Sequence, residues 1–322
     1  MEEILPNLYR IEIPLPETPL KSLNSYVIKG EERNLIIDTG LNRKECLDAM
    51  NAGLNELDID LAKTDIFITH LHADHFGLVS SLATSETEVF FNRADAEIIE
   101  AGDGLERAVN YSALNGFPDN DLRNALRSHP GYKYFSSWIP DFKILNDGEL
   151  IQVGDFSFKC VITPGHSSGH TCLYDAVHKM LIAGDHILQD ITPNIQCWSE
   201  NEDPLGDYLN SLEKVSKMDI NLVLPGHRKI FRNPAKRIKE LKNHHRERLE
   251  EVLSILSKKS LNAYQVASHM CWNINAKNWD LFPVAQKLFA TGEAIAHLQY
   301  LYKREKISQT TEGKVKIYSI KG

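Results

Sequence analysis

The seven residues from Thr69 to His75 constrain this chain more than any other part of it. They spell Thr-His-Leu-His-Ala-Asp-His and directly follow the apolar run 65–68, which is typical of a buried strand. Four potential metal ligands fall within six residues: His70, His72, Asp74 and His75. A strand that ends here leaves these side chains on a loop at a sheet edge, where they can converge on a cation. Neutral imidazole and carboxylate suit zinc and similar metals, so the run predicts a metal site.

Three further apolar strands end on a ligand-type side chain. Segment 158–162 leads into Pro164-Gly165-His166, segment 181–184 into Asp185, and segment 222–226 into His227. A glycine stands directly before each of these ligands, and glycine lets the backbone bend sharply and approach an ion closely. The repetition disfavours two simpler interpretations, a polar loop with chance histidines and a single structural zinc site.

These motifs follow one another in the order found in a known family. They are Ile36-Ile37-Asp38-Thr39-Gly40, the H-x-H-x-D-H loop, Pro164-Gly165-His166-Ser167-Ser168-Gly169-His170, Gly184-Asp185 and Pro225-Gly226-His227. Across roughly residues 8–232 the chain resembles the metallo-β-lactamase superfamily, in particular its dinuclear hydrolase branch. That branch includes proteins like glyoxalase II and the lactamase-beta-like endoribonuclease.

The resemblance implies a role for each ligand-type residue. The first metal would be held by His70, His72 and His166. The second would be held by Asp74, His75 and His227. Asp185 would bridge the two ions, with a hydroxide between them, and Asp74 would also orient that hydroxide and carry its proton. Two divalent metal ions are therefore expected, with zinc favoured, although iron and manganese accept the same ligands.

Differences between this sequence and neighbouring branches of the superfamily narrow the range of reactions that the site could catalyse. Asp185 stands where many zinc β-lactamases have cysteine, which disfavours antibiotic hydrolysis. His72 stands where the oxygen-reducing flavodiiron branch has glutamate, which disfavours redox iron. Mononuclear-iron persulfide dioxygenases share part of the pattern and remain an alternative, but they do not need the second-metal residues found here.

The resemblance also implies an α/β fold, the four-layer αββα metallo-β-lactamase sandwich with a small C-terminal α+β domain. The sequence agrees, because two strand-rich sets alternate with helical segments. The first set predicts strands at 8–13, 25–28, 34–37 and 88–91 and helices at 43–56 and 76–84. The second predicts strands within 142–162 and 171–183 and a helix at 206–217. Asp38 and His170 are expected to support the ligand loops rather than to bind metal.

Residues 1–236 are expected to form the catalytic domain. Residues 93–140 lie between its two predicted sets of strands and do not belong to either set. This helical insert is rich in large aromatic side chains: Tyr111, Phe117, Tyr132, Tyr134, Phe135 and Trp138. It predicts either an extra packed helical pair or a lid over an apolar or acyl pocket. Trp198 is expected either at the mouth of the same site or in the interior.

Residues 237–322 differ in charge from the rest of the chain. They contain 15 basic and 8 acidic residues, whereas the remainder contains 21 basic and 36 acidic ones. Helices predicted at 235–257, 261–267 and 284–305, followed by a β-pair, resemble a winged-helix domain. Because the last helix is mainly apolar, packing or homodimer formation is favoured over nucleic-acid binding. His244 and His245, in a charged stretch, are expected to be solvated.

The composition of the chain indicates the class of protein and its location. The chain has 322 residues, a net charge of −8 and 42% hydrophobic residues, which are ordinary values for a globular protein. No apolar run reaches the ~18–20 residues of a membrane span, and the N-terminus is acidic, unlike a signal peptide. Five scattered cysteines give no disulfide framework. A cytoplasmic enzyme that does not act at a membrane is predicted.

Two classes of hydrolase follow from these observations. The favoured one acts on a small-molecule thioester, ester or lactone. The alternative is a metal-dependent endoribonuclease acting on single-stranded RNA, since the same ligand set serves a phosphoryl centre. The acidic balance of residues 1–236 disfavours a polyanion at the catalytic face, because phosphate binding depends on clustered lysine and arginine. A catalytically inactive binding protein is disfavoured by the complete ligand set.

Overall fold

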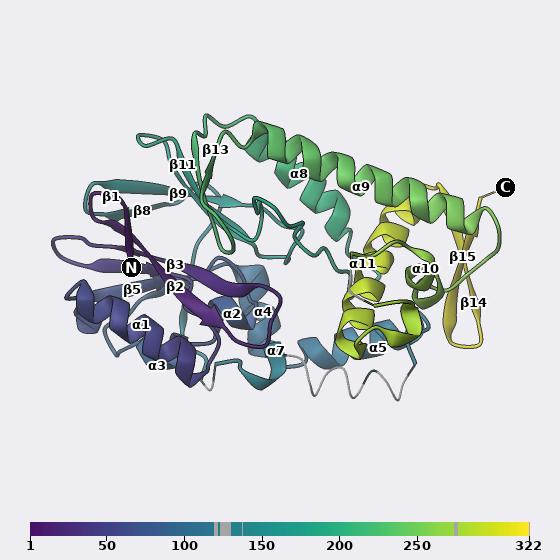
Figure 1. The fold of residues 1–322 in the computed structure, drawn as a ribbon, viewed down its shortest axis with the longest axis horizontal. Coiled ribbons are helices and arrows are strands. Elements are labelled where there is room, and N and C mark those ends of the chain that lie inside the picture. Colours follow the sequence, from purple (N-terminus) through teal and green to yellow (C-terminus); the bar gives the residue numbers. More distant parts are fainter. Residues whose placement is uncertain (119–121, 123–129, 137, 274–275, 322) are drawn as a thin grey trace.

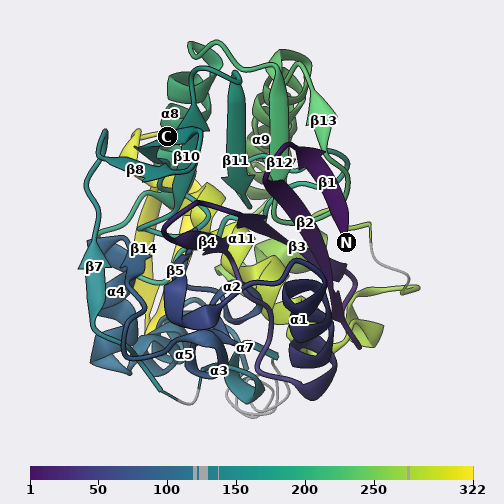
Figure 2. The same cartoon turned by 90° about the vertical axis from the view of Figure 1, so that its left-hand side faces the viewer.

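The computed structural model of the protein describes residues 1–118, 122, 130–136, 138–273 and 276–321. Two β-sheets pack against each other, and helices cover their outer faces (Figures 1 and 2). The first sheet has seven strands in chain order: β1 (Glu2–Leu5), β2 (Leu8–Leu15), β3 (Lys21–Ile28), β4 (Asn34–Ile37), β5 (Thr64–Phe67), β6 (Val89–Phe91) and β7 (Phe142–Ile144). The second has six, in the order β13 (Phe231–Arg232), β12 (Leu222–Pro225), β11 (Met180–Gly184), β10 (Thr171–Asp175), β9 (Phe156–Ile162) and β8 (Leu150–Val153). The predicted α/β sandwich is confirmed.

The core between the sheets is built from the inward faces of both. Tyr26, Leu35 and Phe67 of the first sheet share one apolar cluster with Phe158 and Leu224 of the second. Because strands in this cluster are also covered on their other face, β4 and β5 are buried at every position. That explains why the sequence shows continuous apolar runs there rather than alternation.

One strand lies in a different sheet from the one predicted. Residues 142–144 were expected in the second strand set, but β7 pairs in parallel with β6, with Val89 opposite Phe142. A parallel pair needs a long crossover, and the insert supplies it. The chain therefore crosses to the second sheet only after Ile144. Strand pairing of this kind depends on tertiary contacts that local sequence does not contain.

Helices cover the sheets through spaced apolar residues. On the first sheet lies α1 (Lys44–Glu56), whose Cys46, Met50 and Leu54 are buried. On the second lie α8 (Pro204–Ser216) and the first half of α9 (Ala235–Leu256). Asp203 caps α8 by accepting a hydrogen bond from the Gly206 N–H at 3.2 Å, and Pro204 suits the first turn. The short elements are η1 (Leu61–Lys63), α2 (Ala73–Phe76), α3 (Val79–Leu82), α7 (Pro130–Lys133) and η2 (Trp279–Leu281).

The described part of the insert contains the helices α4 (Arg93–Ala101) and α5 (Gly104–Leu114), which contact each other, and the short α7. Just beyond α5, Asn115 Oδ1 accepts a hydrogen bond from the Tyr318 hydroxyl at 2.9 Å. The insert therefore joins the sandwich to the C-terminal region. Residues 119–121 and 123–129 and the side chain of Tyr132 lie outside the described residues, and the lid stays a prediction.

The C-terminal region has the predicted order of elements. The long α9 leads into α10 (Ala263–His269), α11 (Val284–Lys303) and the antiparallel hairpin of β14 (Ile307–Glu312) and β15 (Val315–Ile320). The apolar face of α11 is packed inside the protein, where Ala294, Ile295 and Leu298 are fully buried. This accounts for the small number of basic residues on that helix.

His245 corrects a prediction made from the sequence. It was expected to be solvated, but only 1% of it is exposed, because α9 turns this side chain toward α11 and His297. The charged residues around it occupy the other faces of α9, which hides the apolar stripe in the sequence. His244 is partly buried. Among the described residues, the structure contains no helix with the length and apolar character needed to cross a membrane.

Candidate metal centre

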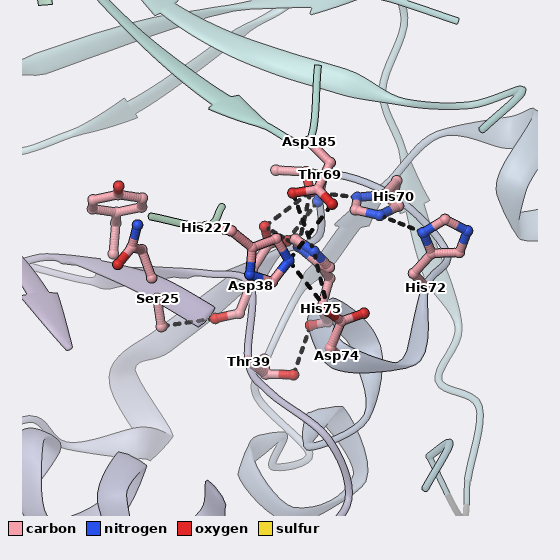
Figure 3. Close-up of polar contacts among 12 residues, drawn as sticks. Ser25, Asp38, Thr39, Thr69, His70, His72, Asp74, His75, Asp185 and His227 are labelled. Atoms are coloured by element: carbon pink, nitrogen blue, oxygen red, sulfur yellow. Dashed lines mark hydrogen bonds and ion pairs between the residues drawn. The ribbon is translucent and has the colours of Figure 1, made fainter. Parts of the chain in front are cut away.

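Four loops bring the predicted ligands to one edge of the sandwich. His70 and His72 follow β5, and Asp74 and His75 lie in the single-turn helix α2. The other three ligands end strands of the second sheet or follow them: His166 after β9, Asp185 after β11 and His227 after β12. Figure 3 shows residues of this set turned toward a common centre. All seven predicted ligands therefore come together.

The first pocket consists of His70, His72 and His166, whose ligand atoms lie within 4.8 Å of one another. The Nε2 of His70 and the Nδ1 of His72 face each other at 2.9 Å. Asp185 stands at the open side, with its Oδ2 3.5 Å from His166 Nε2. Three imidazoles and a carboxylate match the tetrahedral coordination of zinc and related ions.

The second pocket consists of Asp74, His75 and His227, again with ligand atoms within 4.8 Å of one another. Asp74 Oδ2 lies 3.2 Å from His227 Nε2. Asp185 faces this pocket too, since its Oδ1 lies 3.6 Å from His75 Nε2 and its Oδ2 3.5 Å from His227 Nε2. One carboxylate thus reaches histidines of both pockets, which is the geometry a bridging ligand requires.

Four of the atoms that face the centre have no hydrogen-bond partner in the described part of the chain. The buried Nε2 atoms of His75, His166 and His227 accept and donate no hydrogen bond among the described residues, and neither does Asp185 Oδ1. Buried polar atoms are normally paired, since an unpaired one costs about 1–3 kcal/mol. Four such atoms aimed at one point fit the binding of divalent cations.

On each of these three histidines, the other ring nitrogen, Nδ1, forms a hydrogen bond to an oxygen. His75 Nδ1 donates to Asp38 Oδ2 at 2.7 Å, His166 Nδ1 to the Asn194 carbonyl at 2.8 Å, and His227 Nδ1 to the Ser22 carbonyl at 2.8 Å. This is the usual arrangement of metal-binding histidine, because the outer bond fixes the ring and its tautomer. The carbonyls of Asn194 and Ser22 were not identified from the sequence, since any residue type supplies a carbonyl.

Asp38 has the supporting role that the sequence predicts. Besides His75, it holds the loop itself: Oδ1 accepts from the Thr69 N–H and Oδ2 from the Thr69 hydroxyl, both at 2.8 Å. The same hydroxyl lies 3.0 Å from His70 Nδ1. His170 also lies behind the centre, where its Nε2 accepts from the Asp185 N–H at 3.1 Å.

Two glycines make the close packing of the ligand loops feasible. A Cβ at Gly226 would lie 2.7 Å from Asp185 Oδ1 and 2.8 Å from His75 Cε1. A Cβ at Gly184, whose φ is +46°, would lie 2.8 Å from both Thr69 and His170. Any side chain at either position would push ligand loops apart, so the expectation for a glycine before each of these ligands is confirmed.

The two pockets differ in electrostatics. In the first, burial lowers the pKa of His166 and lowers that of His72 to about 3, assisted for His72 by neighbouring His166. These imidazoles are held neutral, which is the metal-binding form. In the second, burial also lowers the pKa of His75, but Asp38 and Asp185 outweigh it and raise the value to about 10. The second pocket is therefore the one rich in negative charge.

His186 and Trp198 pack against other side chains. His186 is fully buried, and its ring packs edge-on against the ring of Tyr208 in α8, with 5.4 Å between the ring centroids. Trp198 packs in an apolar cluster with Phe117 of the insert and Leu288 of α11. Trp198 is partly buried, and its predicted place at the mouth of the site or in the interior stays a prediction.

Comparison with known families agrees with this geometry. A family profile described as the metallo-beta-lactamase superfamily matches residues 19–227, which is more than half of the chain. The chain belongs to the metallo-beta-lactamase superfamily. A second profile, described as the metallo-beta-lactamase-like C-terminal domain, matches residues 249–319. The predicted family is confirmed, and so is a superfamily-specific C-terminal domain.

Similar superfamily members include named enzymes. The chain is 28% identical to the acyl-coenzyme A thioesterase MBLAC2 of Gallus gallus over 214 residues, which cover 65% of this chain and 73% of that protein. It is 27% identical to the probable metallo-hydrolase YqjP of Bacillus subtilis, covering 89% and 90% of the two chains. It is 25% identical to an atrochrysone carboxyl ACP thioesterase of Emericella nidulans, covering 83% and 71%.

Solved structures of the superfamily superpose over nearly the whole chain. A metallo-beta-lactamase family protein of Thermus thermophilus gives a TM-score of 0.83 at 26% identity, covering 99% of this chain and all of the other. A beta-lactamase domain protein of Burkholderia ambifaria gives 0.85 at 25% identity, covering 99% and 94%. The C-terminal region is thus part of the shared architecture.

Proposed function

We propose that this protein is a dinuclear metal-dependent hydrolase that cleaves acyl thioesters, such as those of coenzyme A or an acyl carrier. The observation that carries the proposal is the set of buried, unpartnered ligand atoms on His75, His166, His227 and Asp185. The choice of thioester rests on the relatives named as thioesterases. Zinc is the favoured metal, because imidazole and carboxylate in four-ligand sets suit it.

Each ligand has a proposed role in this reaction. His70, His72 and His166 would hold one divalent ion. Asp74, His75 and His227 would hold the other. Asp185 would bridge them. When bound, such a pair polarises a carbonyl and lowers the pKa of water toward ~7.

Asp74 is the proposed catalytic residue. Burial raises its pKa, but attraction to the imidazoles of His75 and His227 outweighs burial and keeps the pKa below its usual range. Asp74 is therefore an anion, and 19% of its side chain is exposed, against 9% for Asp185. Its Oδ2 would take a proton from the attacking water and deliver it to the departing sulfur, which gives a carboxylic acid and a thiol.

A substrate assay tests the function. Purified protein loaded with zinc is expected to release thiol from a panel of acyl-coenzyme A esters of increasing chain length, and chelator treatment is expected to abolish release. A thiol-reactive dye detects the product. Because Cys271 is exposed and free, one equivalent of dye per chain must be subtracted.

The same preparation separates the alternatives. Efficient cleavage of single-stranded RNA without thioester turnover would replace this proposal by the endoribonuclease. A single tightly held iron per chain, instead of two metals, would replace it by the persulfide dioxygenase.

The domain boundary, the role of the C-terminal domain and the location of the protein are also proposals. We place the boundary between the catalytic and C-terminal domains at residues 236 and 237, in the first turn of α9, where the charge balance changes. The C-terminal domain is proposed to be winged-helix-like and to serve packing or homodimer formation. Its buried α11 supports packing over nucleic-acid binding. All five cysteines are free, which supports a cytoplasmic location.

A further inference from the structure

Asp95 is a buried carboxylate that the proposed chemistry does not use. It lies in the first turn of α4, and none of its side chain is exposed to solvent. Its described partners are all neutral donors, without a cation among them. Burying an ion without an opposite charge is expensive, so the donors that surround it must compensate.

All three donors belong to the loops that carry the first pocket. Asp95 Oδ2 accepts from the Leu71 N–H at 2.9 Å, and Leu71 stands between His70 and His72. The same oxygen accepts from the Ser167 hydroxyl at 2.7 Å, and Oδ1 accepts from the Gly169 N–H at 2.6 Å. Ser167 directly follows His166. One carboxylate therefore joins the two loops that supply the three histidines.

Gly169 provides an independent sign of this close fit. A Cβ at Gly169 would lie 2.7 Å from the Asp95 backbone nitrogen and 2.8 Å from Asp95 Cγ. It would also lie 2.7 Å from Asn92 Oδ1, which caps α4 by accepting from the Ala94 N–H at 2.9 Å. The His166 loop thus rests directly on the first turn of α4.

We propose that Asp95 is a positioning residue of the first metal pocket, an inference that rests on the proposed metal-dependent function. It holds the His70–His72 segment and the His166 loop at the separation that the first ion requires. None of its described hydrogen bonds reaches a ligand of the second pocket. Its loss should therefore weaken metal binding mainly at the first pocket.

Asn is the informative replacement because it keeps the shape and removes the acceptor capacity. An amide has one accepting oxygen and one NH₂ donor. Either orientation of the amide would set its NH₂ against a backbone N–H, of Gly169 or of Leu71. One loop would then be released. Loss of a partner that orients ligands typically lowers metal affinity ~10–100-fold.

Two single-pocket backgrounds make the experiment selective. His227→Ala removes a ligand of the second pocket, and His166→Ala removes one of the first. Zinc affinity is measured in each background by competition with a chromophoric chelator, with and without Asp95→Asn. We expect a ~10–100-fold loss in the His227→Ala background and a change below about twofold in the His166→Ala background.

Asp175 supplies the matched control. It too is a fully buried aspartate that accepts backbone N–H groups, from His178 at 2.8 Å and Ser157 at 3.2 Å. It lies at the end of β10 remote from His170. Asp175→Asn should lower thermal stability and leave zinc affinity at the first pocket unchanged.

The outcomes are distinct. Equal zinc affinity with and without Asp95→Asn in the His227→Ala background overturns the inference, and so does an equal loss caused by Asp175→Asn. If Asp95→Asn does not fold, Ser167→Ala decides: a loss of several-fold at the first pocket supports the inference, and no loss overturns it. Absence of zinc binding by the native protein would instead overturn the proposed function.

Discussion

The two candidate pockets lie side by side, yet they are supported by different parts of the molecule. The second pocket is supported from within the sandwich. The Ser22 carbonyl of β3 holds His227, and Tyr26 and Asn24 of β3 donate to the Pro225 carbonyl at 2.8 and 2.9 Å. These contacts cross from one sheet to the other, so this pocket is fixed by the strands themselves.

The first pocket is supported from outside the sandwich. Asp95 belongs to the insert, and the Asn194 carbonyl that orients His166 belongs to the loop between β11 and α8. That loop is held by α11: Gln299 donates to the Glu200 carbonyl at 2.6 Å and Lys303 to the Asn201 carbonyl at 2.7 Å. Further contacts come from Arg304 to Asp203 and from Lys316 to Glu200.

This difference links Asp95 of the insert and α11 of the C-terminal region to the first candidate pocket. The insert also touches α2, which carries His75, because the Phe135 ring stacks on the Phe76 ring at 5.1 Å. We therefore expect changes at Asp95 or in α11 to weaken metal binding at the first pocket more than at the second. Substitutions at Asp74, His72 and Gly292 test this expectation.

The largest effect is expected for Asp74→Ala, which removes the proposed proton carrier and a proposed ligand of the second pocket. Turnover should fall by at least ~10²–10⁴, the usual cost of losing a general acid–base group. The first pocket should keep its metal, as measured by metal analysis after gel filtration. His72→Ala is the counterpart and should mainly empty the first pocket. A near-native rate for Asp74→Ala would show that another group carries the proton.

A smaller effect is expected from α11. A Cβ at Gly292 would lie 3.1 Å from Gln196 Cγ and 3.2 Å from Trp198, so Gly292→Leu should displace the loop that orients His166. We expect a loss of about tenfold in zinc affinity at the first pocket, measured in the His227→Ala background. Ala285→Leu adds the same side chain at a partly exposed position of the same helix and should have no such effect. If both variants bind zinc with equal affinity, α11 does not influence the metal centre.

The smallest effect concerns acid stability of the C-terminal region. Burial lowers the pKa of His297 to about 3, with Arg248 and His244 acting in the same direction, and burial likewise lowers that of His245. The unfolded chain binds protons near pH 6.5 and the folded one does not, so stability is lost as pH falls below about 6.5. From pH 7 to pH 5, His297 should account for roughly 2 kcal/mol of unfolding free energy.

Chemical denaturation at the two pH values measures this loss. Native protein and His297→Leu are compared, because leucine cannot titrate. The native protein should lose more stability on acidification than the variant. An identical loss in the two proteins would mean that His297 is protonated in the folded state.

The sequence predicted which side chains come together at the candidate centre, because each stands at a fixed offset from a strand end. His70, His166 and His227 needed only a local pattern of apolar residues, glycine and imidazole. The sequence did not reveal the role of Asp95, because the contacts of this side chain are with residues far away in the sequence. Asp95 lies 24 residues from Leu71 and 74 from Gly169, and an aspartate in a first helical turn is common at any helix.

The same reason explains the errors in the fold. Residues 142–144 join the first sheet because β6 offers a free edge after a long crossover, which no local pattern records. His245 sits in a charged segment, and only the packing of α9 on α11 shows that its face is internal.

The bonds between β3 and the Pro225 loop also set the order in which the protein can mature. Asn24 and the Pro225 carbonyl are 201 positions apart in the chain. A ribosome makes the H-x-H-x-D-H loop well before the Pro225 loop that closes the second candidate pocket. Contacts of such separation form late in folding. The histidines of the first loop are therefore made before the geometry of the second pocket exists.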